Sequence, residues 1–291
     1  MNQTKKKNPL KRLLSMRGMG QVVTVTIGLI VLLVAFALIN PNFWSPTNRT
    51  NLLRQIAPIL IIGIAQSYVL ITGNIDLSIG SVVGMSTMVA ATLMSKGIMS
   101  PIPALLVTLL CCLLIGVLNG LLVAKFKLPP FIATLGTMTV ARGIAQLVNG
   151  NYNTDSIMKF YPEAAQTFKN VFYYGKTLGL YNGIWIAIIL WIVFNFLLSK
   201  TRTGRYIYAT GSNIDAARLS GVNVVSTTVI AYVVSAFCSF VVGIITCATV
   251  GQGTMDAGNS YEMYAVAASV IGGVSTLGGQ GILLGTVVGA A

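Results

Sequence analysis

The sequence predicts an all-α fold, a polytopic helical membrane protein with about 8–10 transmembrane helices. Of its 291 residues, 55% are hydrophobic and only 9% are charged, whereas a soluble domain carries about 25% charged residues. Nine apolar segments also recur along the chain, and most approach the ~20 residues that a helix needs to cross the hydrocarbon core. These segments are residues 22–39, 56–72, 77–95, 102–124, 131–148, 183–198, 222–247, 264–273 and 282–291.

The chain divides into a short basic tail and one transmembrane domain. Residues 1–21 hold six lysines and arginines and no acidic residue, which predicts a cytoplasmic N-terminal tail. Segment 22–39 is longer than the apolar core of a secretory signal peptide, and no small-residue cleavage site follows it. We therefore expect an uncleaved first span and a single transmembrane domain over residues 22–291. Segment 264–273 is too short to cross alone and predicts a short, tilted or re-entrant helix.

The distribution of basic residues supports a topology with the N-terminus inside. Counting spans from that end places twelve lysines and arginines on the inner side and six on the outer side, as expected for a membrane protein. This bias also accounts for the net charge of +13, so we expect no nucleic-acid partner. The longest outer connection, residues 149–182, is polar and aromatic. Its length is typical of a functional or self-packed loop, so it predicts either a lid or docking surface for an extracytoplasmic partner or a packed cap.

The inner connection at residues 200–223 contains the capping residues of one short helix. Asn213 is placed to cap its N-terminus, Asp215 lies in the first turn, and Gly221 can end it. A helix of about two turns is too short to be stable alone in water, so we expect it to dock on another surface. The alternative is an ordinary connector that contains a helical turn.

A second polar stretch interrupts the apolar pattern at residues 71–81, ITGNIDLSIGS. Asp76 is the acidic residue most plausibly at membrane depth, and Thr72, Asn74 and Ser78 surround it. A carboxylate at a helix centre costs about 2.5–3.5 kcal/mol on insertion scales. We consider two compatible roles, which are lining the path of a transported solute and capping a helix that begins after a break.

The same stretch has an echo two hundred residues later. Ile71-x-Gly73-x-x-x-Leu77 recurs as Ile271-x-Gly273-x-x-x-Leu277, and a Gly80-x-x-x-Gly84 spacing recurs at residues 281–285. Glycine-interrupted apolar segments at corresponding positions of a repeat are typical of a translocation site. An internal repeat is therefore predicted, with Gly80 and Gly273 added to the candidates for the path. Its orientation, inverted or parallel, is left open.

Three motifs resemble one family. GSNIDAARLSGVNV, residues 211–224, is similar to the coupling-helix segment in permease subunits of bacterial ATP-binding-cassette importers for ribose, galactose, xylose and related solutes. ITGNIDLSIGS and YEMYAVAASVIGGVSTLGGQG, residues 261–281, resemble the family's other two signatures. The resemblance implies that Asn213, Asp215, Ala216, Ala217, Arg218 and Gly221 couple the chain to an ATP-binding subunit. Ala216 and Ala217 would lie on the helix surface, where they fit a groove.

The resemblance also implies a set of partners. An ATP-binding subunit hydrolyses ATP, an extracytoplasmic sugar-binding protein delivers solute, and a second permease, identical or related, completes the path in the bacterial inner membrane. The chain itself has no G-x-x-x-x-G-K-[ST] phosphate loop and no histidine, so we expect neither enzymatic activity nor a cofactor or metal of its own. Family members continue with further hydrophobic sequence, which implies a truncated C-terminus here. The alternative function is an ion-coupled secondary transporter that uses Asp76.

Overall fold

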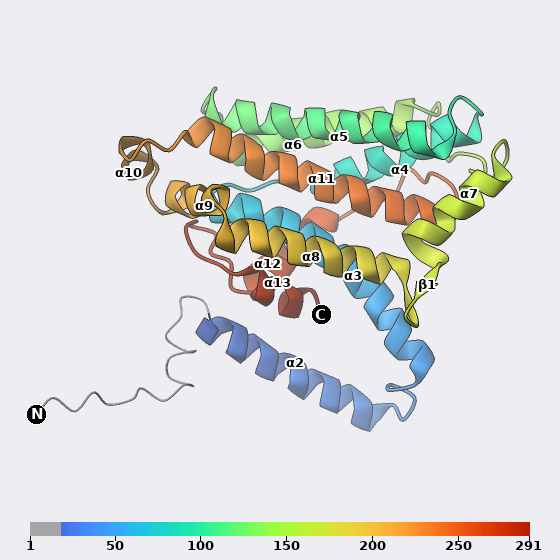
Figure 1. The fold of residues 1–291 in the computed structure, drawn as a ribbon, viewed down its shortest axis with the longest axis horizontal. Coiled ribbons are helices and arrows are strands. Elements are labelled where there is room, and N and C mark those ends of the chain that lie inside the picture. Colours follow the sequence, from blue (N-terminus) through green and yellow to red (C-terminus); the bar gives the residue numbers. More distant parts are fainter. Residues whose placement is uncertain (1–18) are drawn as a thin grey trace, which may run out of the picture.

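The computed structural model describes residues 19–291 as a bundle of long helices (Figure 1). The tail 1–21 lies almost entirely outside these residues. Each of the nine predicted apolar segments corresponds to a helix, with bounds that differ from the predicted ones by up to ten residues. The helices are α2 (Met19–Ile39), α3 (Pro46–Ile71), α4 (Ile79–Ser95), α5 (Pro101–Ala124), α6 (Pro130–Leu147), α8 (Asn182–Lys200), α11 (Val224–Val250), α12 (Tyr261–Ile271) and α13 (Leu283–Ala290).

The prediction of a polytopic helical membrane protein is confirmed. Within the described residues, α2, α3, α5, α8 and α11 are long and apolar enough to cross a membrane, while α4 and α12 are apolar but shorter. The count of about 8–10 spans stays a prediction. Large apolar side chains on the outer faces of α2, α5, α6 and α8 are exposed, which suits contact with lipid because lipid leaves no reason to bury them.

Local sequence signals explain where the helices begin and end. Pro46, Pro101 and Pro130 each occupy the first turn of their helix, where the missing N–H is not needed and the fixed φ is already helical. Asn223 caps α11 by accepting the N–H of Ser226 at 3.0 Å. The same helix ends at Gly251, whose left-handed φ of 79° suits glycine.

Helices α3, α4 and α11 form the centre of the bundle. Helix α4 is buried along almost its whole length, and α11 packs against α3, α4 and α5. Small residues permit this close packing, because a side chain at Gly116 or Gly120 of α5 would collide with the α11 backbone. Helix α2 diverges from the bundle toward its C-terminal end (Figure 1). An apolar groove of about 580 Å³ lies between α2 and α3, with Ala291 at its wall.

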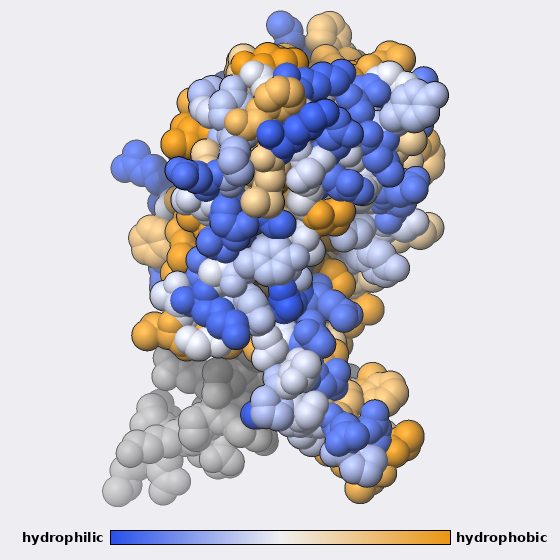
Figure 2. All heavy atoms as spheres, turned by 90° about the vertical axis from the view of Figure 1, so that its right-hand side faces the viewer, coloured by the Kyte–Doolittle hydropathy of each residue, from blue (hydrophilic) through white to orange (hydrophobic). Residues whose placement is uncertain are grey.

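The two ends of the bundle differ in structure. At the α7 end, the predicted outer loop folds into α7 (Pro162–Lys169), the π-helix η1 (Asn170–Tyr174) and a hairpin of strands β1 (Lys176–Thr177) and β2 (Leu180–Tyr181). This end is largely hydrophilic (Figure 2). At the opposite end, α8 leads into α9 (Arg202–Ser212) and α10 (Ile214–Leu219) (Figure 1). The sequence analysis predicted α10 but not α9.

Candidate functional site

The internal repeat is visible in the way α3 and α12 end. Gly73 and Gly273 both adopt left-handed backbone, with φ of 79° and 88°. In each case the next residue closes the helix end, since Asn74 N–H donates to the carbonyl of Val69 and Val274 N–H to that of Ser269. Only glycine takes this conformation at low cost. The repeated Ile-x-Gly signature thus encodes the same helix termination twice.

The two repeated helices run in the same direction. Along α3, Gly63 lies against Ala268 and Ser67 donates to Ser269 Oγ at 3.1 Å. Beyond the end of α3, the Gly73 backbone approaches the carbonyl oxygen of Leu277. Residues later in α3 contact residues later in the 261–281 segment, so the two helices are parallel. For these two elements, the repeat is therefore parallel and not inverted.

The loops that follow the two helices contact each other. Gly279 N–H donates to the carbonyl oxygen of Ile71 at 2.8 Å. A Cβ on Gly278 would lie 2.8 Å from both Gly73 Cα and the carbonyl oxygen of Gly211 in α9. Glycine at these positions therefore allows three backbone segments to touch. We call the loops 72–78 and 272–282 together the glycine joint.

Asp76 lies inside this region and is only 3% exposed. Its Oδ1 accepts the Ser78 N–H at 2.9 Å and the Ser78 hydroxyl at 2.6 Å, and its Oδ2 accepts the Ser235 hydroxyl of α11 at 2.7 Å. The network continues from Ser78 through Asn119 of α5 to Thr137 of α6. A buried carboxylate is tolerated when such donors satisfy it, and here it ties the start of α4 to three other helices.

The hydrogen bonds favour the capping role of Asp76. The Ser78 N–H that it binds belongs to the residue directly before α4, so the carboxylate occupies a donor that the helix start leaves free. Both carboxylate oxygens are already bonded within the chain. Solute contact by Asp76 remains a prediction, and no observation favours the ion-coupled alternative.

The remaining path candidates do not form one cluster. Thr72 and Asn74 are bonded to each other, with Asn74 Nδ2 2.8 Å from Thr72 Oγ1. Gly80 packs against Glu262 and the backbone of Gly258 near the start of α12. Gly273 instead faces Gln21 of α2. Thr72, Asn74 and Gly80 thus lie at or near the break between α3 and α4, whereas Gly273 lies against α2.

Gln66 of α3 is a candidate that the sequence analysis missed. Its side chain is fully buried, and neither its amide oxygen nor its amide nitrogen has a hydrogen-bond partner among the described residues. An unpaired buried amide costs roughly 1–3 kcal/mol and calls for an explanation. The only sequence signal was a glutamine within an otherwise apolar run, which did not distinguish it from Asn119.

Arg142 of α6 bonds to backbone carbonyls and not to Asp76. Its Nη1 donates to the carbonyl oxygens of Met255 at 2.9 Å and Ala257 at 3.0 Å. These carbonyls belong to the irregular segment 251–260, which joins α11 to α12. The guanidinium thus donates to carbonyl oxygens that lie outside any helix. Nonhelical backbone inside a membrane protein needs such partners.

Helix α10 has the predicted caps. Asn213 Oδ1 accepts the N–H of Ala216 at 2.9 Å, Asp215 lies in the first turn, and Gly221 turns the chain with φ of 81°. Arg218 lies 3.5 Å from Asp215 in an exposed ion pair, a contact of little energetic weight.

The expectation that both alanines lie on the surface of α10 is wrong for Ala217. Ala216 is exposed, but Ala217 is only 4% exposed, and its carbonyl oxygen accepts the N–H of Val222. Ala217 therefore packs against the rest of this chain and is not available on the surface of α10. The exposed apolar side chains of α10 are Ile214 at 48% and Leu219 at 90%, which sequence reasoning overlooked.

Helix α9 connects α10 to the glycine joint. The Tyr208 hydroxyl donates to the carbonyl oxygen of Gly281 at 2.6 Å, and burial raises the pKa of Tyr208 to about 12, which keeps this donor protonated. Gly211 packs directly on the carbonyl of Ile71, and Ser212 contacts Gly279. Helix α9 therefore contacts both the end of α3 and the loop after α12.

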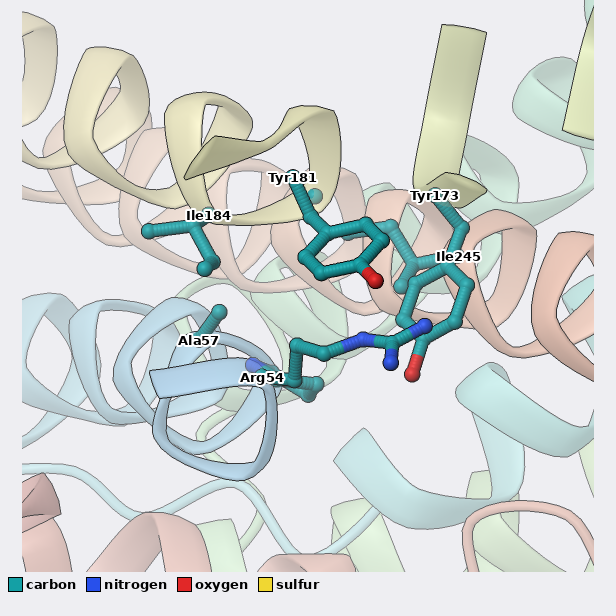
Figure 3. Close-up of a pocket in the computed structure, with 8 residues that line it drawn as sticks. Arg54, Ala57, Tyr173, Tyr181, Ile184 and Ile245 are labelled. Carbon is teal, nitrogen blue, oxygen red and sulfur yellow. The ribbon is translucent and has the colours of Figure 1, made fainter. Parts of the chain in front are cut away.

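At the opposite end, an aromatic cage holds α3 to the folded outer loop. The Arg54 guanidinium lies 4.4 Å from the Tyr173 ring centroid and 4.0 Å from that of Tyr181 (Figure 3). Such cation–π contacts contribute about 0.5–2 kcal/mol each. They join η1 and β2 to the N-terminal half of α3. One helix, α3, thus reaches from this cage to the glycine joint.

The sequence matches a known family over most of its length. The family described as "Branched-chain amino acid transport system / permease component" matches residues 48–291. No solved structure matches the chain.

Curated relatives cover nearly the whole chain. A ribose import permease protein of Haemophilus influenzae is 40% identical over 91% of this chain and 80% of its own length. A galactofuranose transporter permease protein of Escherichia coli is 36% identical, over 97% of this chain and 82% of its own. An autoinducer 2 import system permease protein of Escherichia coli is 32% identical, over 92% and 76%.

Proposed function

Since this chain belongs to the family of branched-chain amino acid transport permease components, we propose that it is the translocation subunit of an ATP-driven importer for a monosaccharide or similar small polar solute. The names of its relatives, which include ribose and galactofuranose permeases, support a sugar over an amino acid. The solute path would follow the glycine joint, where Thr72, Asn74 and Ser78 supply hydroxyl and amide groups suited to sugar hydroxyls.

The observation that carries the proposal is the exposed, capped helix α10 and its connection through α9 to the glycine joint. An ATP-binding subunit would dock on α10. When that subunit closes on ATP, α10 would move, and the contact of Gly211 with Ile71 would pass the displacement to α3. Transport then needs no ATP site or cofactor in this chain.

This function sets the orientation and the partners. The α10 end faces the cytoplasm together with the N-terminal tail, and the polar α7 end faces outward in the bacterial inner membrane. There the folded loop 149–182 would receive solute from an extracytoplasmic sugar-binding protein. A second permease, either another copy of this chain or a related one, would complete the path.

Substitution of one exposed leucine tests the docking step. Leu219→Glu places a charge on the outer face of α10, where the native side chain is 90% exposed and folding does not depend on it. Leu178→Glu makes the same change at the α7 end, where the leucine is 86% exposed. We expect the chain to co-purify with its ATP-binding subunit in wild-type and Leu178→Glu form, and Leu219→Glu to lose the subunit. Equal recovery of the subunit with all three proteins would refute docking on α10.

A further inference from the structure

We propose that the turn around Leu277, between α12 and α13, is a second docking element for the ATP-binding subunit. The inference rests on the proposed function and deepens it. It begins from the Leu277 side chain, which is 89% exposed although the loop that carries it is well ordered by hydrogen bonds. Single exposed leucines are common on protein surfaces. Exposure alone therefore does not identify a docking site, and the residues around Leu277 must support it.

The turn holds Leu277 outward in a fixed position. Ser275 N–H donates to the carbonyl of Gln280 at 3.0 Å, and Ser275 Oγ accepts the Leu277 N–H at 3.2 Å. Gly278 and Gly279 follow with left-handed φ of 85° and 70°. The turn therefore presents the leucine on a defined backbone, which lowers the entropic cost of inserting it into a partner.

The turn belongs to the same end of the molecule as α10. Its Gly279 contacts Ser212, the last residue of α9, and Tyr208 binds the Gly281 carbonyl. A cavity of about 340 Å³ lies between α9 and the turn, lined by Tyr208, Ser212 and residues 279–282 among others. Both α10 and the turn therefore adjoin α9 at the same end of the molecule, and we infer that one partner covers both.

The chemistry of this end defines the partner surface. Leu277, Leu219 and Ile214 are large exposed apolar side chains on the turn and α10, and exposed basic residues lie on α10 and the neighbouring helices. The exposed basic residues on α8, α9 and α10 are Lys200, Arg202, Arg205 and Arg218. Interfaces commonly place apolar side chains at the centre and charges at the rim. The complementary surface is an apolar groove with an acidic rim on the ATP-binding subunit.

A second docking element would give the partner a shorter route to the translocation helices. The Leu277 carbonyl oxygen lies 3.8 Å from the position of a Cβ on Gly73, directly after α3. Force on α10 would reach α3 through α9, whereas the Leu277 turn is itself part of the glycine joint and contacts the residues after α3 without an intermediate helix. The partner would then contact the chain at α10 and at the second repeat.

Thiol labelling tests the contact directly. Leu277→Cys, Leu219→Cys and Leu178→Cys are each made in a Cys111→Ser background, because the other native cysteines are buried. The full chain in detergent is labelled with a maleimide, with and without the purified ATP-binding subunit. We expect the subunit to slow labelling at positions 277 and 219 by roughly tenfold, as interface cores exclude solvent, and to leave position 178 unchanged.

The outcomes separate this inference from the proposed function. Protection at 219 but not at 277 overturns the second docking element and leaves docking on α10 intact. Protection at neither position overturns both. A matching affinity measurement uses Leu277→Glu, which we expect to weaken binding of the subunit about tenfold, in keeping with a centrally placed interface residue. Unchanged affinity for Leu277→Glu would also overturn the inference.

Discussion

Gly279 donates its backbone N–H to the carbonyl oxygen of Ile71 at a distance of 2.8 Å. This bond joins the last residue of α3 to the loop that follows α12, about two hundred residues later in the sequence. Gly211 of α9 packs against the same carbonyl. Three elements, α3, α9 and the loop after α12, therefore meet at one peptide group.

Gly211→Ala should disrupt this contact. A Cβ at position 211 would overlap the Ile71 carbonyl and lie 2.7 Å from Gly279 N, so α9 would have to move away. Overpacking of this kind costs about 1–3 kcal/mol. We expect a lower unfolding temperature in detergent and loss of uptake of ribose as a test sugar, because α9 no longer transmits displacement.

The control for this substitution is Gly143→Ala on α6. Gly143 has open space around its Cβ position, so alanine should be neutral or should stabilise the helix by up to about 1 kcal/mol. Equal effects of the two substitutions on uptake would argue against the contact at Ile71.

Asp76→Asn should destabilise the start of α4. The carboxylate accepts from Ser78 and from Ser235, while an amide places an N–H₂ where one of these donors points. Loss of a buried charge-assisted bond costs about 1.5–3 kcal/mol. A double-mutant cycle with Ser235→Ala, read by chemical denaturation, should give a coupling energy of about 0.5–3 kcal/mol, as contacting residues do. Additive effects would contradict the network.

The nine apolar helices were predictable from sequence, because they depend on local signals. Apolar runs, prolines at helix starts and the glycine of each Ile-x-Gly motif act within a few residues. The caps of α10 at Asn213 and Gly221 were predicted for the same reason. The echo of residues 71–77 in 271–277 was also readable, since the same helix termination needs the same glycine.

What sequence could not supply were the contacts between distant segments. Helix α9 was missed because its sequence, RTGRYIYATGS, has two glycines and few apolar residues, and its helical state depends on packing against Gly279 and Gly281. The partners of Arg142 are backbone carbonyls of an irregular segment. No residue pattern in the sequence predicts such a contact. The burial of Ala217 likewise follows from how α10 sits on its own chain.

Arg54→Lys should loosen the folded loop 149–182. The flat guanidinium stacks between Tyr173 and Tyr181, and an ammonium cannot reproduce that stacking. We expect a loss of about 0.5–2 kcal/mol, seen as faster amide hydrogen exchange in residues 170–181. Arg49→Lys on the same helix is the matched control, because Arg49 is exposed and its side chain makes no hydrogen bond within residues 19–291. Equal exchange in both variants would show that the cage carries no stability.

Gln66→Leu should separate stability from transport. Both amide atoms of Gln66 are buried without partners, so an apolar side chain of similar length removes a desolvation penalty of about 1–3 kcal/mol. The variant should therefore unfold at a higher temperature than the wild type. If the amide is kept for a solute hydroxyl during transport, uptake should fall in the same variant, which is the trade-off expected where function requires a destabilising group. Met85→Leu in α4, a fully buried apolar exchange of similar volume, should leave both properties nearly unchanged. A Gln66→Leu protein with unaltered uptake would exclude Gln66 from the path, and one with reduced stability would show that its amide has a structural partner.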